Sequence, residues 1–377
     1  MKKGRKIKVL MLIVNLKAAD GITNYALNYF RKINHNVIHM DFVVYDSENM
    51  VQSYITEIEN EGSKIFTLPS FFTMYKHYKE CWKILKQGKY DIIHDNSLII
   101  TIPMMFVAKQ MGIQIRILHS HNSKLGETKI KEIRNKCFLP FLKMFITDYI
   151  ACSMLAGKTL FGNKKFIVIP NVINAEKYRF NEEKRKEVRK SLGVENKYIV
   201  ATVGRIALQK NPFFAMDVFK LVAEQERTAE YWWIGSGSLD EDLKKYIKEI
   251  GIEDKVKLFG SREDVNDLYQ AMDCFFAPSL FEGFSIVSVE AQAMGLPCVL
   301  SNEVIKEIAY TDLVSFVKLE EEKKVWADKI LDKRFGKRDY YEHLINSDFS
   351  DKKAGRRLEK LYENLLLQKG VEAKNNI

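Results

Sequence analysis

The residues best suited to chemistry lie in one stretch, residues 273–301, which reads DCFFAPSLFEGFSIVSVEAQAMGLPCVLS. Two glutamates, Glu282 and Glu290, stand within it with seven residues between them. A carboxylate accepts hydrogen bonds from hydroxyl groups, often two at once, and its charge makes these bonds strong. We therefore expect the two glutamates to contact the neutral, hydroxyl-rich parts of a ligand.

The same stretch predicts an anion site between the two carboxylates. Ser285 is expected to cap a helix that ends at Gly295, and the free backbone N–H groups of its first turn carry partial positive charge. Gly283 has no side chain to block close approach of a phosphate, and Phe284 completes the loop. A diphosphate flanked by two sugars, as in a nucleotide sugar, fits this layout.

A second constellation lies upstream in VATVGRIALQKNPFFAMDVF. A strand is predicted to end at Gly204, Arg205 and Lys210 occupy the following loop, and Asn211 is predicted to cap the next helix. Two cations beside a helix N-terminus would neutralise a diphosphate leaving group as its charge develops. The alternative is a solvated basic loop.

The segment WWIGSGSLDEDLKKY carries two further signals. Gly235 and Gly237 permit the tight turn of a nucleotide-proximal loop in a Rossmann-like sheet. The acidic run 240–242 has the Asp-x-Asp spacing of a metal motif, but acidic residues are favoured in a first helical turn by the helix dipole. We therefore expect no metal here.

Three histidines end neighbouring strands in the first half of the chain. His119 and His121 follow the apolar run IRIL, and His94 ends DIIH. A His-x-His pair invites a metal interpretation, but no third ligand stands at ligand spacing, so a structural role is favoured. His94 is expected on the side of the site that receives the acceptor.

These residues are held by an alternation of strands and helices that predicts parallel sheets covered on both faces. The first half predicts strands at 8–14, 38–45, 64–68, 91–94, 115–118, 148–152 and 165–169, and helices at 22–33, 50–61, 72–88, 98–111 and 153–161. The second half predicts strands at 198–203, 231–235, 256–259, 273–277, 297–300 and 313–317, with helices starting near Pro212, Leu239, Glu263, Ser285 and Val304. The sequence therefore predicts two doubly wound domains with a border near residues 170–175 and a ligand at the carboxyl ends of the strands.

Composition and charge narrow the class of protein. The chain has 377 residues, of which 46% are hydrophobic and 29% charged, and no apolar run approaches the roughly 20 residues of a membrane span. Its net charge of +10 sits in the first half, where residues 1–175 hold 25 Lys and Arg against 13 Asp and Glu. An excess of positive charge in one half of the chain suggests that this half binds an anionic partner. The alternative is a general abundance of lysine that serves solubility. The five cysteines are scattered and are expected to be buried in a reducing cytosol.

Two amphipathic segments stand outside this scheme. The segment 124–145 mixes six basic residues with apolar ones, and either lies on an anionic membrane or packs on the domain core. Near the C-terminus, Ser350 is expected to cap a helix with an apolar stripe at Leu358, Leu361 and Leu365.

The motif FEGFSIVSVEAQAMGLP, with Glu282 and Glu290, resembles the signature of the GT-B-fold family of retaining nucleotide-sugar glycosyltransferases, which includes capsule and exopolysaccharide enzymes. The resemblance implies two Rossmann-like α/β domains facing each other across a cleft. Residues 1–172, joined by a C-terminal helix at 351–369, would form the acceptor-side domain. Residues 173–350 would bind the nucleotide sugar.

The resemblance also implies roles for individual residues. Arg205 and Lys210, following Gly204, would stabilise the departing diphosphate together with the helix end at Gly283, Phe284 and Ser285. Glu282 would contact the donor sugar and Glu290 the ribose. Other positions that match the family are the phosphate-facing Gly21, the nucleobase segment around Phe259 and Arg262, and the sugar-proximal histidine His121, with His119 as second choice.

The function that follows is transfer of a sugar from a nucleoside diphosphate, with UDP favoured, to a glycan that is expected to be lipid-linked, in bacterial surface polysaccharide synthesis. We expect no metal cofactor, no nucleic-acid partner, and a cytoplasmic location with peripheral contact at the inner face of the membrane. Two alternatives stay open: a nucleotide-sugar epimerase on the same fold, and a non-enzymatic binder whose basic half grips nucleic acid.

Overall fold

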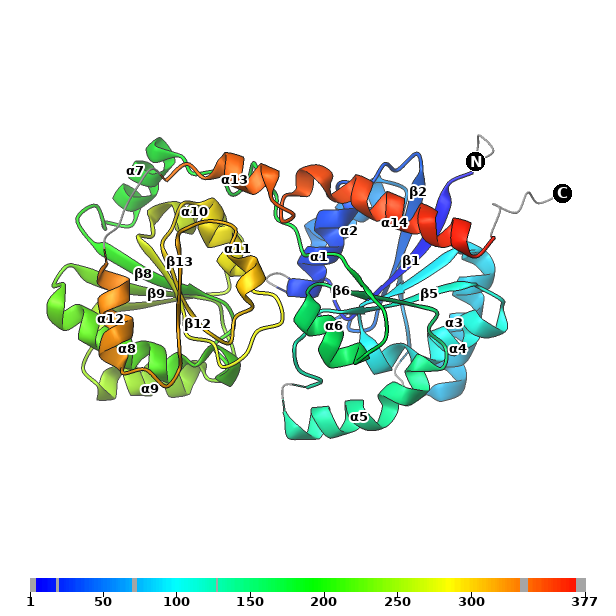
Figure 1. Cartoon of the computed structure of the whole chain (residues 1–377), viewed down its shortest axis with the longest axis horizontal. Coiled ribbons are helices and arrows are strands. Elements are labelled where there is room, and N and C mark those ends of the chain that lie inside the picture. Colours follow the sequence, from blue (N-terminus) through cyan, green and yellow to red (C-terminus); the bar gives the residue numbers. More distant parts are fainter. Residues whose placement is uncertain (1–4, 18–19, 70–72, 127, 333–337, 371–377) are drawn as a thin grey trace. The chain divides into compact units, whose positions relative to one another are not determined.

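The structure is a computed structural model that describes residues 5–17, 20–69, 73–126, 128–332 and 338–370. The chain divides into two compact units (Figure 1). Unit 1 comprises Met1–Val172 and Asp351–Ile377, and unit 2 comprises Ile173–Ser350. Each unit is an α/β fold around its own parallel sheet, which confirms the predicted fold class.

Unit 1 is built on a sheet of the order β3-β2-β1-β4-β5-β6-β7 in the described residues. Its strands are β1 (Ile7–Ile13), β2 (Ile38–Val44), β3 (Ile65–Thr67), β4 (Ile92–Asp95), β5 (Ile115–Ser120), β6 (Asp148–Ala151) and β7 (Ile167–Val168). Its helices are α1 (Gly21–Phe30), α2 (Gln52–Asn60), α3 (Met74–Gly88), α4 (Ile102–Gln110), α5 (Lys129–Lys143), α6 (Met154–Phe161) and α14 (Ala354–Gln368), with 3-10 turns η1 (Leu98–Thr101) and η5 (Asp351–Lys353).

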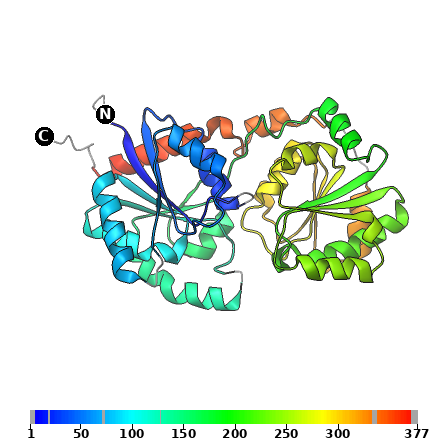
Figure 2. The same cartoon turned by 180° about the vertical axis from the view of Figure 1, so that it is seen from behind.

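The core of unit 1 follows from the alternation of side chains along its strands. Val9, Met11 and Ile13 of β1 lie in one apolar cluster with residues of α1 and α14. Leu10 and Leu12, between them, are equally buried but project to the opposite face of the sheet. Helices lie on both faces of this sheet, as Figure 2 shows from behind. The near-continuous apolar runs of the sequence are therefore those of a parallel sheet buried on both sides.

Unit 2 repeats this plan with the strand order β10-β9-β8-β11-β12-β13. Its strands are β8 (Tyr198–Val203), β9 (Ala229–Ile234), β10 (Val256–Gly260), β11 (Cys274–Ala277), β12 (Cys298–Ser301) and β13 (Val314–Val317). Its helices are α7 (Glu182–Ser191), α8 (Pro212–Gln225), α9 (Asp240–Glu249), α10 (Val265–Ala271), α11 (Ile286–Ala293), α12 (Lys323–Leu331) and α13 (Tyr341–Asn346), with 3-10 turns η2 (Leu208–Lys210), η3 (Glu253–Lys255) and η4 (Lys306–Ile308).

Two apolar clusters cover the two faces of the unit 2 sheet. The neighbouring residues Trp232 and Trp233 of β9 are both fully buried, yet they lie in different clusters because adjacent side chains of a strand point to opposite faces. Phe275 and Phe276 of β11 are divided in the same way. The sheet thus has an apolar core on each face, and the connecting loops lie at the ends of its strands.

Several sequence expectations are wrong in detail. Ser350 does not cap α14, because the 3-10 turn η5 intervenes and the helix begins at Ala354 with Lys353 at its N-cap. The helix expected near Val304 is reduced to the short turn η4. Cys137 is exposed, although the other four cysteines are buried as expected.

Candidate functional site

The loops that follow β8 and β11 are bonded to each other at the carboxyl edge of the unit 2 sheet. The backbone N–H of Leu280 donates to the carbonyl of Gln209 (2.8 Å), and the Gln209 side chain donates back to the carbonyl of Phe281 (3.1 Å). The strands β8 and β11 are neighbours at the point where the strand order reverses. Doubly wound sheets bind their ligands at such a switch point.

Lys210 and Glu282 form an ion pair between these two loops. The Lys210 ammonium donates to Glu282 Oε1 at 2.5 Å, and the side chains are only 13% and 7% exposed. The hydroxyl of Ser279 donates to the same oxygen (3.2 Å). The sequence predicted these two residues as separate contacts to phosphate and sugar, whereas the structure joins them to each other.

Gly204 makes room for the lysine. Its φ of +146° lies in a region that favours glycine, and a Cβ there would stand 2.9 Å from Cε of Lys210. Arg205 follows directly and is exposed at the start of the same loop. The structure therefore brings Gly204, Arg205, Lys210 and Glu282 to one corner of unit 2.

Ser285 and Asn211 occupy the predicted N-cap positions of α11 and α8, but neither side chain makes the predicted capping hydrogen bond. The Ser285 hydroxyl bonds to the Ser288 hydroxyl (2.8 Å) rather than to a backbone N–H of α11. Asn211 has a left-handed backbone (φ 55°), and its amide donates to the Pro278 carbonyl (3.2 Å) instead of capping α8. Both side chains hold the loops in place.

Two N–H groups at the start of α11 already have partners. The N–H of Ile286 donates to the Phe284 carbonyl (3.1 Å), and that of Ser288 to the Ser285 carbonyl (3.1 Å). The sequence predicted that the N–H groups of this first turn would be free, and for these two groups the prediction is wrong. Gly283 is buried, and the Phe284 ring packs on that of Phe349 with centroids 5.6 Å apart.

Glu290 lies on α11, one helical turn after the start of the helix at Ile286, and is buried. It is 7% exposed, and the Tyr269 hydroxyl donates to its Oε2 (3.2 Å). Burial raises the pKa of Glu290 to about 7, against hydrogen bonds from Tyr178 and Tyr269 that lower it. The carboxyl is thus close to its midpoint of ionisation at neutral pH.

The predicted nucleobase segment lies at the end of β10 on the same edge of the sheet. Phe259 packs its ring on Trp232 (5.1 Å between centroids), and Arg262 forms an exposed ion pair with Asp264 (2.6 Å). The N–H of Gly235, after β9, donates to the Gly260 carbonyl (2.8 Å). Arg262 is therefore bonded within its own loop and not to the Lys210–Glu282 pair.

Three histidines of unit 1, His94, His119 and His121, form a stack at the carboxyl ends of β4 and β5. His94 is fully buried, with Nδ1 bonded to the Tyr362 hydroxyl of α14 (2.8 Å) and Nε2 to His119 Nδ1 (3.0 Å). The expectation that His94 lines an acceptor site is wrong, because its ring faces the core. Burial lowers the pKa of His94 to about 3.

His121 completes this stack over His119, with ring centroids 4.1 Å apart. Its Nε2 is bonded to Asn96 Oδ1 (2.8 Å), while the Asn96 amide nitrogen donates to the Leu12 carbonyl (3.2 Å). Because the amide oxygen of Asn96 can only accept, Nε2 of His121 carries the proton and Nδ1 carries the lone pair. Burial lowers the pKa of His121 to about 3.

Three buried polar atoms of this stack have no hydrogen-bond partner in the part of the chain that the structure describes. They are the Nδ1 of His121, the Nε2 of His119 and the hydroxyl of Tyr25, whose ring lies 4.8 Å from both histidine rings. Unpaired buried polar groups are costly and mark places where a ligand or water bonds. The lone pair of His121 can accept a hydrogen bond from a hydroxyl.

Gly21 opens α1 as predicted, and a Cβ there would meet nothing within 4 Å. The preceding Asp20 accepts from the N–H groups of Ile22 (3.1 Å) and Thr23 (2.9 Å). This carboxylate already supplies negative charge at the helix N-terminus, so the expected phosphate contact there is disfavoured.

Sequence reasoning missed the residues that hold the key side chains. Ser279 and Gln209 stand around the Lys210–Glu282 pair, Tyr269 bonds Glu290, and Asn96 fixes His121. Only Asn96 carried a signal, since it directly follows a strand that ends at this edge. The others are ordinary polar residues whose roles depend on contacts between distant segments.

No group of three or more His, Cys, Asp or Glu residues in the described ranges is arranged to hold a metal ion. No described helix combines the length and apolar character needed to span a bilayer.

Comparison with known proteins assigns the chain to a family. Residues 183–330 match the family model of glycosyl transferases group 1. An uncharacterized glycosyltransferase of Haemophilus influenzae is 33% identical over 300 residues, covering 78% of this chain and 80% of the relative. The UDP-Gal:alpha-D-GlcNAc-diphosphoundecaprenol alpha-1,3-galactosyltransferase of Escherichia coli is 26% identical over 302 residues, covering 75% of this chain and 76% of that enzyme.

Solved structures share the fold. The crystal structure of Anabaena Alr3699/HepE in complex with UDP-glucose superposes with a TM-score of 0.76 at 17% identity, covering 95% of this chain and 100% of that chain. At this identity the likeness concerns the fold alone.

Proposed function

The chain belongs to the group 1 glycosyltransferases, and from that premise we propose that it moves a sugar from UDP to a hydroxyl of a lipid-linked glycan, with retention at the anomeric carbon. Unit 2 is the donor-binding unit in this proposal, and unit 1 contributes His121. The product would enter bacterial surface polysaccharide.

The observation that carries the proposal is the Lys210–Glu282 pair at the switch point of unit 2. Arg205 and Lys210 place a guanidinium and an ammonium in one loop, as a developing diphosphate charge requires. Glu282 orients the ammonium and offers acceptors to sugar hydroxyls. Glu290, eight positions later, would accept hydrogen bonds from the ribose, while the backbone around Phe259 and Arg262 would border the nucleobase.

The proposed reaction is a front-face displacement. The acceptor hydroxyl oxygen bonds to the anomeric carbon as the bond from that carbon to the diphosphate oxygen breaks and its electron pair passes to the phosphate. The leaving phosphate takes the proton of the acceptor hydroxyl. His121 would accept a hydrogen bond from a hydroxyl of the transferred sugar through its unprotonated Nδ1.

The choice of UDP and of a lipid-linked acceptor is supported by the named substrates of the E. coli relative, a UDP-galactose and a diphosphoundecaprenol-linked sugar. Such an acceptor is embedded in a membrane. We therefore propose that the protein works at the inner face of the cell membrane.

We also propose that transfer needs no metal, because the two cationic side chains take the part that a divalent ion plays in other transferases. Full activity after dialysis against EDTA is expected. Loss of activity that Mg²⁺ or Mn²⁺ restores would contradict this part of the proposal.

The proposal is tested by a screen of nucleotide sugars for thermal stabilisation, followed by transfer of the stabilising sugar to lipid extracts. A new glycolipid with the donor's anomeric configuration is expected. Conversion of the nucleotide sugar to an epimer without acceptor would instead show the epimerase, and an inverted product would overturn retention.

A further inference from the structure

The exposed aromatic side chains of the described residues gather on three helices of unit 1. Five large aromatic residues are exposed in the described ranges, and all of them lie on α3, α4 or α5: Tyr75, Trp82, Phe106, Phe138 and Phe141. Contiguous exposed apolar surface on a soluble domain marks an interaction site. Neither the donor site nor the histidine stack uses these residues.

Helix α5 has two apolar stripes where a surface helix normally has one. Leu139 and Leu142 are buried against unit 1. Ile130, Ile133 and Phe141 recur at helical spacing on the other side and are 81%, 63% and 56% exposed, and Met144, just past the helix end, is 64% exposed. Packing on the core therefore explains only one stripe, and the second faces solvent.

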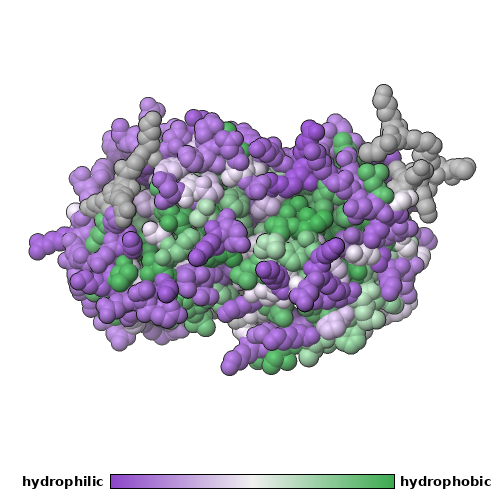
Figure 3. Space-filling view, in the orientation of Figure 1, coloured by the Kyte–Doolittle hydropathy of each residue, from purple (hydrophilic) through white to green (hydrophobic). Residues whose placement is uncertain are grey.

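The three helices form one continuous surface. The Tyr78 ring of α3 lies 6.4 Å from that of Phe106 in α4, and Phe106 lies 5.5 Å from Phe145, just past the end of α5. Figure 1 shows α3, α4 and α5 together at the edge of unit 1, and Figure 3 shows hydrophobic residues mixed with hydrophilic ones over α5. We call this surface the α3–α5 face.

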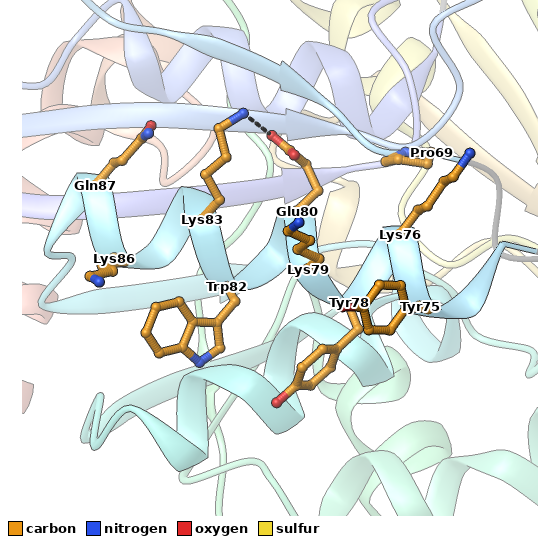
Figure 4. A pocket seen from close by; sticks show the side chains of 10 residues that line it. All are labelled: Pro69, Tyr75, Lys76, Tyr78, Lys79, Glu80, Trp82, Lys83, Lys86 and Gln87. Atoms are coloured by element: carbon orange, nitrogen blue, oxygen red, sulfur yellow. Dashed lines mark hydrogen bonds and ion pairs between the residues drawn. The ribbon is translucent and has the colours of Figure 1, made fainter.

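The α3–α5 face is strongly basic. The three helices carry ten Lys and Arg residues against two glutamates. A groove along α3 is lined by four lysines together with Tyr75, Tyr78 and Trp82, and Figure 4 shows these rings on one side of the helix. The Lys86 ammonium lies 5.0 Å from the Trp82 ring centroid, so a cation and an aromatic ring lie side by side at this point of the surface.

We propose that the α3–α5 face docks on an anionic lipid bilayer, an inference that rests on the proposed function at the membrane and names the surface involved. Tryptophan and tyrosine settle at the level of lipid headgroups, aliphatic tips such as Ile130 and Met144 reach the acyl boundary, and lysines bind anionic headgroups. A second copy of the same face would bring like charges together. A nucleic acid would leave the exposed isoleucines without a stacking partner.

The inference is tested by flotation of the full-length protein with vesicles. Vesicles of phosphatidylcholine containing phosphatidylglycerol are compared with vesicles of phosphatidylcholine alone, each at low and high salt. Binding to the anionic vesicles is expected, at least tenfold above that to the neutral ones and weaker at high salt. Equal binding to both vesicles, or to neither, would overturn the proposal.

Variants separate the contribution of charge from that of apolar contact. Lys79→Glu/Lys129→Glu changes two exposed lysines of the face, and Ile133→Ser/Phe138→Ser/Phe141→Ser removes apolar side chains of α5. Each is expected to lower vesicle binding at least tenfold. Lys186→Glu/Lys190→Glu on exposed positions of α7, and Leu367→Ser on α14, are the matched controls that should bind as the native protein does.

Folding of every variant is checked by circular dichroism and thermal melting. Unchanged vesicle binding in both folded test variants would overturn the proposal. The proposal would also be overturned if native protein did not float with vesicles but bound RNA or self-associated, and if the same variants abolished that binding. Vesicle binding requires no nucleotide sugar. A failure to bind vesicles would therefore not contradict the proposed transfer reaction, which is tested by the transfer assay.

Discussion

Lys210 is the residue on which the proposed chemistry depends most. Its ammonium is held by Glu282 at 2.5 Å and its stem passes over Gly204, so contacts within the protein fix its position. Preorganised charge is the most effective form of electrostatic catalysis, because nothing has to reorient as the diphosphate departs.

Replacement of Lys210 by alanine is therefore expected to lower kcat by about 10²–10³-fold. It also removes the ammonium that pairs with the buried Glu282 carboxylate, which is expected to lower the free energy of unfolding by up to about 3–5 kcal/mol. Turnover is measured at a temperature where melting curves show both proteins folded. Lys220→Ala, at an exposed position of α8, is the control; near-native turnover of Lys210→Ala would remove the assignment.

The proposed contact of Glu290 with the ribose predicts that donor binding depends on pH. Its pKa is raised to about 7 by burial, and only the ionised carboxylate accepts hydrogen bonds from both ribose hydroxyls. Affinity for UDP is expected to fall, by up to tenfold per pH unit, as the pH drops below about 7. Calorimetric titrations of native protein and Glu290→Gln are compared, since protonation of UDP affects both alike. Identical pH profiles would exclude Glu290 from the site.

The histidine stack makes a prediction that NMR can check. The pKa of His121 is lowered from 6.5 to about 3, so its ring is expected to stay neutral, as the Nε2–H tautomer, between pH 5 and pH 8. Long-range ¹H–¹⁵N spectra report this directly, with His121→Gln for assignment. Asn96→Asp places a carboxylate on Nε2–H and should raise the pKa. Titration of native His121 near 6.5 would show that the stack is open to water.

At the scale of elements, α14 ties the C-terminal segment to the core of unit 1. Leu358 is fully buried in the same cluster as β1 and α1, whereas Leu367 on the same helix is 71% exposed. Leu358→Ala is expected to lower the free energy of unfolding by about 2–5 kcal/mol, and Leu367→Ala to change it by less than about 0.5 kcal/mol. Chemical denaturation measures both. Equal effects would mean that α14 does not pack as described.

Strands were easier to predict from the sequence than helix ends. The runs YIVATV and DCFFA are buried on both faces and match β8 and β11 within a residue, because apolar strands of a parallel sheet need no partner-specific signal. Ser285, Asn211 and Ser350 are all suited to capping, but the Ser285 hydroxyl bonds locally to Ser288 of the same helix and the Asn211 amide bonds to the distant Pro278 carbonyl. At Ser350 a 3-10 turn displaces the start of the helix.

At the scale of the whole molecule, each unit has its own sheet and core, and each gathers its polar residues at the carboxyl edge of that sheet. The motif FEGFSIVSVE identified the unit 2 site because its chemistry lies within one continuous segment. The unit 1 stack was only partly foreseen, since Tyr25, Asn96 and His121 come from three separated segments and meet only in the fold.

The most direct test of the account is a crystal structure of the protein with UDP bound. The account predicts electron density for the diphosphate beside Arg205, Lys210 and the start of α11, with Glu290 on the ribose hydroxyls. A nucleotide bound away from the β8 and β11 loops, with the Lys210–Glu282 pair untouched, would contradict it.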